Sequence, residues 1–247
     1  MLKSSIGRKY GFKRQLMDHR DFKYALIKPQ GVVLPSSVDL SGKCGTPFNQ
    51  GQLGSCTANA LAGAMDFIRQ GLIASRLFIY YNERVIEDTV SYDAGANLRD
   101  GIKSLASQGV CRETLWAYDV FKFAVKPPQA CYDLALKDVI KSYHALDTLD
   151  DMKSCLAEGF PFVFGFTVYP EMESADVARN GIVPMPKKGE SPLGGHAVMA
   201  VGYDDETNLF KIMNSWGPLW GKAGFFFLPY DYLSNPNLAS DLWTVRS

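Results

Sequence analysis

The pattern of apolar positions divides the chain into a helical first half and a strand-rich second half. Between residues 58 and 72, apolar side chains recur at steps of three and four, which predicts an amphipathic or fully buried helix. The same spacing predicts a second helix over 98–106, and Pro127-Pro128 can open a third. The segment Thr148-Leu149-Asp150-Asp151 has the form of a capping box and predicts a fourth.

After about residue 160, β-branched and aromatic runs replace the helical spacing. Residues 162–168 lie between two prolines and predict a strand. Residues 197–203 and 209–213 predict two strands separated by a hairpin loop rich in turn residues, and 224–228 predicts a further strand. Helices first and strands second predict an α+β protein with two lobes that meet near residue 145, and a cleft between lobes is a usual place for a site.

Composition excludes several classes of protein. Hydrophobic residues make up 47% of the 247 residues, which suffices for a sizeable core and argues against intrinsic disorder. The 26 basic residues balance the 26 acidic ones, whereas a nucleic-acid-binding protein usually carries a basic surplus. Five cysteines form no CxxC pair and no Cys/His spacing suited to zinc, so we expect no metal site. Their odd number and low density indicate a reducing or indifferent compartment with at least one free thiol.

Residues 1–34 are polar and interrupted by glycines, and we interpret them as an N-terminal extension. They are basic and carry aromatic side chains at Tyr10, Phe12, Phe22 and Tyr24. No apolar segment follows the first charges, and no run of about 18 apolar residues occurs in the chain, so the sequence predicts neither a secretory signal nor a membrane span. We therefore expect a cytoplasmic protein or one exported by a non-classical route, without a membrane or nucleic-acid partner.

One cysteine stands where a helix is predicted to begin. The loop Gln50-Gly51-Gln52-Leu53-Gly54-Ser55 leads directly to Cys56, and its glycines permit a tight turn. A thiol at a helix start faces unpaired amide hydrogens and the positive end of the helix dipole, which both favour the thiolate. Most lone cysteines are nevertheless small buried hydrophobic residues, so this position alone does not establish chemistry.

A histidine and an asparagine flank the predicted hairpin. His196 follows two glycines at the start of one strand, and Asn214 ends the next strand before Ser215-Trp216-Gly217. If these strands pair, the two side chains come to lie at neighbouring strand ends. Taken separately, the histidine could equally be a buried residue at the edge of the core, and the Asn-Ser-Trp-Gly segment a turn with a buried tryptophan.

Together, these segments resemble the papain-like cysteine peptidases. His196 follows Cys56 by 140 residues, which fits the order and spacing of cysteine and histidine in that family. The likeness is specific from residue 50 to 221 and weaker from Leu34-Pro35-Ser36-Ser37-Val38-Asp39 to the C-terminal strands. Four blocks carry it: Gln50 to Cys56, Gly195-His196-Ala197-Val198, Val201-Gly202-Tyr203, and Asn214-Ser215-Trp216-Gly217 with Trp220-Gly221.

The resemblance implies a papain-like two-lobed fold over residues 35–247. Its helical lobe would span about 45–145 and its antiparallel, β-barrel-like lobe about 146–247, with the active site in the cleft between them. Cys56 would be the nucleophile and His196 the general base and then the general acid. It also implies that Asn214 orients the imidazole, that Trp216 shields that bond from water and contacts substrate, and that the Gln50 side chain and the Cys56 backbone N–H form an oxyanion hole.

Several positions depart from the usual family pattern. Thr57 follows the cysteine where many members have an aromatic residue, Leu53 stands where secreted members carry a disulfide cysteine, and Gly195 replaces an Asp or Asn. No Cys-Asn-Gly-Gly segment occurs; residues 93–97 take its place, and we expect Gly95 to allow close approach of a substrate backbone. Ala197 would border the pocket for the second residue before the scissile bond. These departures resemble the microbial or viral branch, which lacks the usual disulfides.

The resemblance further implies peptide or protein substrates, inhibition by protein inhibitors of cysteine proteases, no cofactor and a monomeric state. Residues 1–34 are shorter than the usual inhibitory prodomain. One hypothesis is that they form a short pro-like segment that packs on the enzyme or crosses the cleft, so that the chain is a zymogen. The alternative is a structural N-terminal wrap without a regulatory role.

Three other functions stay open at this point. A Cys/His acyltransferase or deamidase, such as a transglutaminase-like protein, would favour an aspartate as third member instead of Asn214. A catalytically silent peptide-binding relative would be expected to lack Cys56, His196 or Gln50, and all three are present. A structural protein with a chance motif is the remaining alternative.

Overall fold

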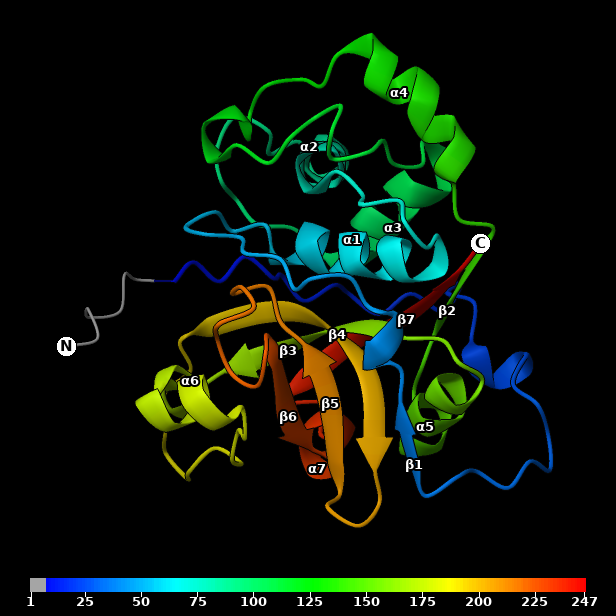
Figure 1. The fold of residues 1–247 in the computed structure, drawn as a ribbon, viewed down its shortest axis with the longest axis vertical. Coiled ribbons are helices and arrows are strands. Elements are labelled where there is room, and N and C mark those ends of the chain that lie inside the picture. Colours follow the sequence, from blue (N-terminus) through cyan, green and yellow to red (C-terminus); the bar gives the residue numbers. More distant parts are fainter. Residues whose placement is uncertain (1–7) are drawn as a thin grey trace.

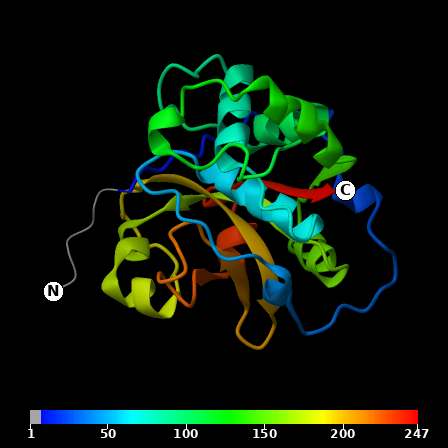
Figure 2. The same ribbon diagram turned by 45° about the horizontal axis from the view of Figure 1, so that its top comes forward.

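Helices gather on one side of the molecule and strands on the other, as the order of elements along the chain predicts (Figure 1). The computed structural model describes residues 8–247. A view turned by 45° again shows the helical lobe above the strand-rich lobe (Figure 2). The main helices of the upper lobe are α1 (Cys56–Ile68), α2 (Arg76–Ile86), α3 (Leu98–Ser107) and α4 (Gln129–Ala135).

Local sequence explains where these helices begin and end. Asn97 accepts a hydrogen bond from the Asp100 N–H and so caps α3, which matches the predicted helix over 98–106. The first helix ends at Ile68 and not at residue 72, because Arg69 leaves the helical conformation and Gly71 adopts a φ of 83°. Leu72 is still buried, but from the following loop, which explains its place in the apolar pattern.

The lower lobe is built on a seven-stranded sheet. Its strand order is β2-β7-β3-β4-β5-β6, and β1 pairs with β4, all neighbours being antiparallel. Within residues 8–247 the outer strands β2 and β6 do not pair with each other, so the expected barrel-like lobe is an open sheet. The strands are β1 (Ser37–Asp39), β2 (Ser142–Ala145), β3 (Phe162–Val168), β4 (Gly194–Asp204), β5 (Leu209–Met213), β6 (Phe225–Pro229) and β7 (Ala239–Arg246).

The predicted hairpin between β4 and β5 is present and sets the position of two candidate residues. Asp204 pairs with Leu209 at the loop end, and Met199 pairs with Met213 toward the other end. His196 lies three residues before Met199, and Asn214 directly follows Met213. Both therefore lie at the end of the hairpin that is remote from its loop.

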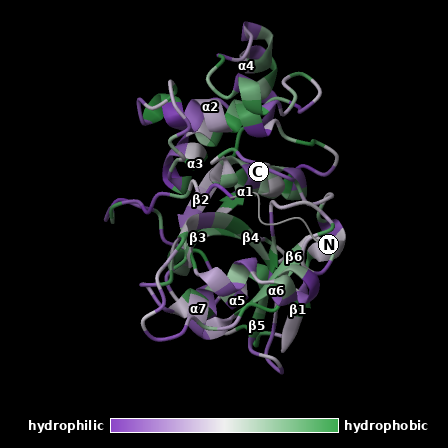
Figure 3. Cartoon of the chain, turned by 90° about the vertical axis from the view of Figure 1, so that its left-hand side faces the viewer, coloured by the Kyte–Doolittle hydropathy of each residue, from purple (hydrophilic) through white to green (hydrophobic). Residues whose placement is uncertain are grey.

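Two apolar clusters hold the lobes together. Alternate residues of β3 point to opposite faces of the sheet, so Val163 joins the core around α1 whereas Phe162, Phe164 and Phe166 fill the lower lobe. The central strand β4 is largely green in Figure 3, in agreement with its burial on both faces. Shorter helices cover the lower lobe: α5 (Leu149–Ala157) with the predicted capping box of Thr148 and Asp151, α6 (Ala175–Asn180) and α7 (Tyr230–Ser234).

The described part of the N-terminal extension, residues 8–34, runs along the boundary between the lobes before it reaches β1 (Figure 1). Phe12 forms a parallel bridge with Ala96 in the helical lobe, and Lys23 forms one with Ala145 at the end of β2. All five cysteines lie in the described part of the chain and are free thiols. In residues 8–247, no helix combines the length and the apolar character needed to cross a membrane.

Candidate active site

Cys56 is the first residue of α1 and is fully buried. The preceding Ser55 occupies the N-cap position, but its side chain does not cap the helix; its hydroxyl instead lies 2.6 Å from that of Tyr118. The first amide groups of α1 are therefore free of a side-chain cap where the thiol stands. This places the sulfur at the positive end of the helix, as the sequence predicts.

His196 and Asn214 are joined by a buried hydrogen bond. His196 Nε2 lies 2.8 Å from Asn214 Oδ1, and the same oxygen accepts the Ser215 N–H at 2.8 Å. Because this amide oxygen accepts two bonds, the imidazole must donate from Nε2. Nδ1 is then the unprotonated nitrogen; it is buried and has no hydrogen-bond partner.

Aromatic rings enclose this pair. The Trp216 ring is stacked on His196, with centroids 5.0 Å apart and an interplanar angle of 22°. Tyr10 from the extension and Phe166 from β3 meet the imidazole edge-on at 6.2 and 5.8 Å. The stack covers the histidine and keeps water away from its bond to Asn214.

The backbone N–H of Ala197, the residue after His196, reaches the sulfur of Cys56. Burial raises the pKa of Cys56 to about 11, while backbone N–H groups of Ala197 and Gly11 hydrogen-bond to the sulfur and oppose that rise. Burial also lowers the pKa of His196 to about 4, against the bond to Asn214, which raises it. Both shifts disfavour charge, so in this covered state the site holds a neutral thiol and a neutral imidazole.

Gln50 is buried beside the start of α1, with its side-chain amide fixed at both ends. Its Oε1 accepts the Ser215 hydroxyl at 2.6 Å, and its Nε2 donates to the carbonyl of Leu53 at 3.0 Å and that of Lys9 at 3.4 Å. Ser215 thus orients both Gln50 and Asn214, a role that its place in the sequence motif did not indicate.

Asp93 supports the loop before the nucleophile and was also missed as a functional residue. Its carboxylate accepts the Gly54 N–H with both oxygens at 3.1 Å and also accepts the Tyr80 hydroxyl. Lys9 of the extension forms an ion pair with it at 2.5 Å. The signal in the sequence was its place in the 93–97 segment, to which we assigned only a substrate contact at Gly95.

The extension occupies the cleft over Cys56. Phe12 N–H donates to the carbonyl of Gly195 at 3.0 Å, Gly11 carbonyl accepts the Ala96 N–H at 2.9 Å, and Lys13 N–H donates to the Ala96 carbonyl at 2.9 Å. On the other side of the sulfur, the Arg8 guanidinium lies 4.0 Å from the centre of the Trp216 ring. The segment is therefore held on both sides of the thiol.

The three residues expected to contact substrate all lie beside this segment. Gly95 has a φ of 69°, and a Cβ there would lie 2.0 Å from the Gly11 carbonyl oxygen, so only glycine permits this approach. The Phe12 ring lies against Gly165, the partner of Ala197 in the β3–β4 register. Since paired residues share a face, Ala197 lies on the face that Phe12 covers, while Trp216 lies beneath Arg8.

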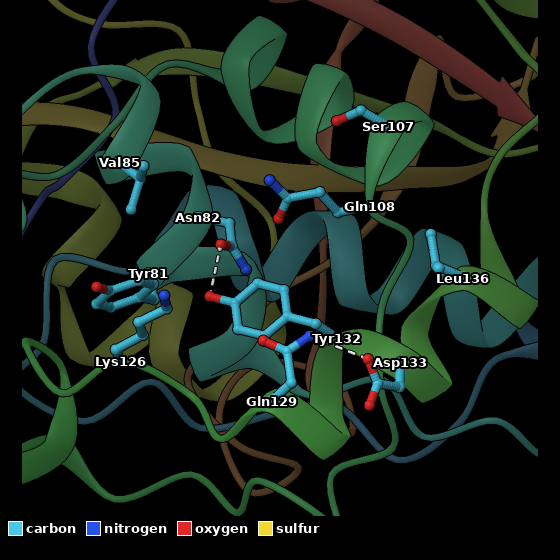
Figure 4. Close-up of a pocket in the computed structure, with 10 residues that line it drawn as sticks. All are labelled: Tyr81, Asn82, Val85, Ser107, Gln108, Lys126, Gln129, Tyr132, Asp133 and Leu136. Carbon is cyan, nitrogen blue, oxygen red and sulfur yellow. Dashed lines mark hydrogen bonds between the residues drawn. The ribbon is translucent and has the colours of Figure 1, made fainter.

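A cavity of about 420 Å³ lies elsewhere, in the helical lobe (Figure 4). Tyr132 donates to Asn82 within it, and Gln129 donates to Asp133. Its lining includes none of Cys56, His196, Asn214 and Gln50. Within residues 8–247, no group of three or more His, Cys, Asp or Glu side chains could hold a metal ion.

Comparison with known proteins identifies the family. Residues 34–242 match the family model described as papain family cysteine protease. The chain belongs to the papain family of cysteine proteases. Xylellain, a cysteine protease from Xylella fastidiosa, has a crystal structure that is 42% identical and matches with a TM-score of 0.92 over 98% of both chains. This papain-family protease thus has a close bacterial structural neighbour, in line with the microbial or viral branch.

Two curated relatives extend the comparison. A protein described as an uncharacterized peptidase C1-like protein, from Acanthamoeba polyphaga mimivirus, is 41% identical and matches 98% of this chain and 88% of its own length. Bovine pro-cathepsin H is 27% identical over 78% of this chain, which spans 59% of that relative's length. The papain-family protease described here is therefore more similar to the viral protein than to the mammalian cathepsin.

Proposed function

We propose that this papain-family protease hydrolyses peptide bonds through a Cys56 thiolate and a His196 imidazolium. The observation that carries the proposal is the hydrogen bond between His196 Nε2 and Asn214, which leaves Nδ1 as the free base. The sulfur receives the N–H of Ala197, the residue after this histidine. A base with a fixed tautomer, on the strand that reaches a helix-start thiol, supplies the parts that nucleophilic acyl transfer requires.

The steps follow from these positions. Nδ1 of His196 takes the thiol proton of Cys56, and the thiolate attacks the carbonyl carbon of the scissile bond. When the tetrahedral intermediate collapses, the C–N bond breaks and the imidazolium gives its proton to the leaving amine. Water then attacks the thioester, the imidazole accepts the proton of that water, and the acid product leaves as the thiol is restored.

Gln50 Nε2–H and the Cys56 backbone N–H would hold the oxyanion. The carbonyl oxygen of Lys9 already lies 3.4 Å from Gln50 Nε2, which supports this nitrogen as a donor to carbonyl oxygens in the cleft. A donor preorganised by Ser215 stabilises charge as it develops in the transition state.

We also infer that residues 8–16 inhibit the enzyme by filling this cleft. The backbone N–H of Gly11 hydrogen-bonds to the Cys56 sulfur, so the segment passes directly over the nucleophile. Its backbone bonds to Gly195 and Ala96 use groups that a substrate would need. Peptides and proteins are the expected substrates, protein inhibitors of cysteine proteases would compete for the same cleft, and a monomer suffices for the reaction.

Labelling of Cys56 tests the proposed activity. An epoxysuccinyl or peptidyl fluoromethyl ketone probe should add once to the wild-type chain in reducing buffer and should not add to Cys56→Ala. A folded wild-type protein that takes no label and cleaves no peptide would instead favour a catalytically silent relative. Transfer of the acyl group to an added amine faster than to water would favour an acyltransferase.

A further inference from the structure

A carboxylate that pairs with the extension lies beside the cleft at the end of α2. Glu87 is the C-cap of that helix, and its side chain is 10% exposed. Its Oε1 accepts the Asn97 backbone N–H at 2.7 Å and the Asn97 side-chain amide at 3.1 Å. Its Oε2 is paired with Lys13 of the extension at 3.0 Å.

The orientation of this carboxylate does not depend on the extension. Asn97 caps α3, its Oδ1 accepting the Asp100 N–H at 3.1 Å, so it is held by the helix it begins. Because Asn97 then holds Oε1 of Glu87 through two bonds, Oε2 remains directed to the cleft when Lys13 leaves. A fixed, largely buried carboxylate favours a cation more than a mobile surface carboxylate does, since less side-chain entropy is lost on pairing.

The position of Lys13 along the extension defines which substrate residue would reach Glu87. Gly11 lies at the sulfur of Cys56, and the next residue, Phe12, lies against Gly165 and Gly195. Lys13 comes after Phe12, on the side away from the sulfur. A peptide with an aromatic side chain in the place of Phe12 would thus bring its next residue, away from the scissile bond, to Glu87.

We propose that Glu87 is a specificity-determining residue that selects peptides with lysine or arginine beside the aromatic residue, on the side away from the scissile bond. The proposal rests on the proposed peptidase function, because it concerns the same cleft. The extension would then imitate this substrate side chain with Lys13, although its backbone meets the nucleophile with an N–H group.

The test compares coumarin peptides that differ at one position: Lys-Phe-Arg, Ala-Phe-Arg and Glu-Phe-Arg, each followed by the fluorophore. Gly11→Ala in the full chain, which displaces the extension, is the parent enzyme. We expect kcat/KM for the lysine peptide to exceed that for the alanine peptide about tenfold, with the glutamate peptide poorest. Glu87→Gln keeps an oxygen for Asn97 and should reduce the lysine-to-alanine ratio to near one. Glu206→Gln, the same charge change in the exposed β4–β5 loop, should retain it.

A second measurement does not rely on the Gly11 variant. In the otherwise wild-type chain, a Lys-Phe-Arg fluoromethyl ketone should label Cys56 about tenfold faster than its Ala-Phe-Arg counterpart, and Glu87→Gln should remove the difference. If the lysine-to-alanine ratio were the same in the parent and in Glu87→Gln, the role of Glu87 would be overturned while the peptidase function would stand. Absence of both cleavage and labelling from the folded protein would overturn the peptidase function and the specificity with it.

Discussion

Gly11 passes so close to Gly54 that a Cβ on Gly11 would lie 1.8 Å from the Gly54 carbonyl oxygen. Gly54 is two residues before the nucleophile, and its own N–H is held by Asp93. The extension therefore lies so close to the loop that leads to Cys56 that a side chain at residue 11 would force one of the two backbone segments to move. Only glycine allows residue 11 to lie against Cys56.

Gly11→Ala should expel the extension from the cleft and raise peptidase activity. The clash is with backbone atoms, which cannot rotate away as a side chain would. We expect kcat/KM for a Phe-Arg coumarin peptide to rise at least about tenfold. Gly42→Ala is the matched control, because a Cβ there meets nothing within 4 Å, and it should leave activity unchanged. Equal activity in folded Gly11→Ala and wild type would refute inhibition by the extension.

The pH dependence of Cys56 alkylation should show whether the extension covers the thiol. Burial raises the pKa of Cys56 to about 11 and lowers that of His196 to about 4, so the thiolate is scarce at neutral pH while the extension is bound. Displacing it in Gly11→Ala admits water, which lowers the thiol pKa and raises that of the imidazole. The rate of iodoacetamide addition to Cys56, followed by peptide mass spectrometry, should then reach its plateau at a lower pH than in wild type. Superimposable profiles would contradict this account.

Ser215 should affect catalysis through Gln50 without contacting the substrate. Gln50→Ala removes an oxyanion donor and should lower kcat by about 10²–10³. Ser215→Ala removes only the hydroxyl that fixes Gln50 Oε1 and should lower kcat about tenfold with little change in KM. Both are measured in the Gly11→Ala chain by initial rates over a range of substrate concentrations. If Ser215→Ala raised KM alone, Ser215 would serve binding and not the oxyanion hole.

The buried Glu83 should behave as a neutral acid beneath the nucleophile. Burial raises its pKa well above the usual value, and its Oε1 accepts the Thr57 hydroxyl at 2.6 Å. Since the folded pKa exceeds the unfolded one, the folded chain loses stability as pH rises above the unfolded value of about 4.5. Glu83→Gln keeps an acceptor for Thr57 but does not titrate. Its free energy of unfolding should therefore increase relative to that of the wild type as pH rises.

Thr57→Val provides the complementary stability measurement. It removes the donor to Glu83 and should destabilise the protein by about 1–3 kcal/mol in urea unfolding at pH 7. Glu83→Gln at the same pH should not lose stability. A large loss of stability in Glu83→Gln together with none in Thr57→Val would show that the Glu83 carboxyl is ionised and held by other groups.

The sequence indicated the candidate site more completely than the fold around it. Cys56, His196 and Asn214 could be located because their positions at a helix start and at two hairpin ends follow from local patterns. Strands β2 and β7 were missed, since they pair with each other across about 100 residues of sequence and only part of their residues are buried. Helix α2 was also missed, although Ser75 caps it.

The supporting residues could not be predicted for a different reason. Ser215 and Asp93 act through single hydrogen bonds to Gln50 and Gly54, which only the folded chain brings near them. The crossing of the cleft by residues 8–16 was one of two hypotheses, because basic and aromatic composition suits both a wrap and a cleft ligand. The contacts of Gly11 with Gly54 and Gly95 place the segment over the loop before Cys56, and its inhibitory role stays a prediction.

We propose that Cys56 attacks peptide carbonyls with His196 as its base once the extension has left. The most direct measurement is the steady-state rate of coumarin release from a Phe-Arg peptide by Gly11→Ala, beside the same chain carrying Cys56→Ala or His196→Ala. The account predicts steady turnover in the first and none above background in the other two, with all three equally folded. Undiminished turnover in either double variant would place the chemistry elsewhere in the molecule.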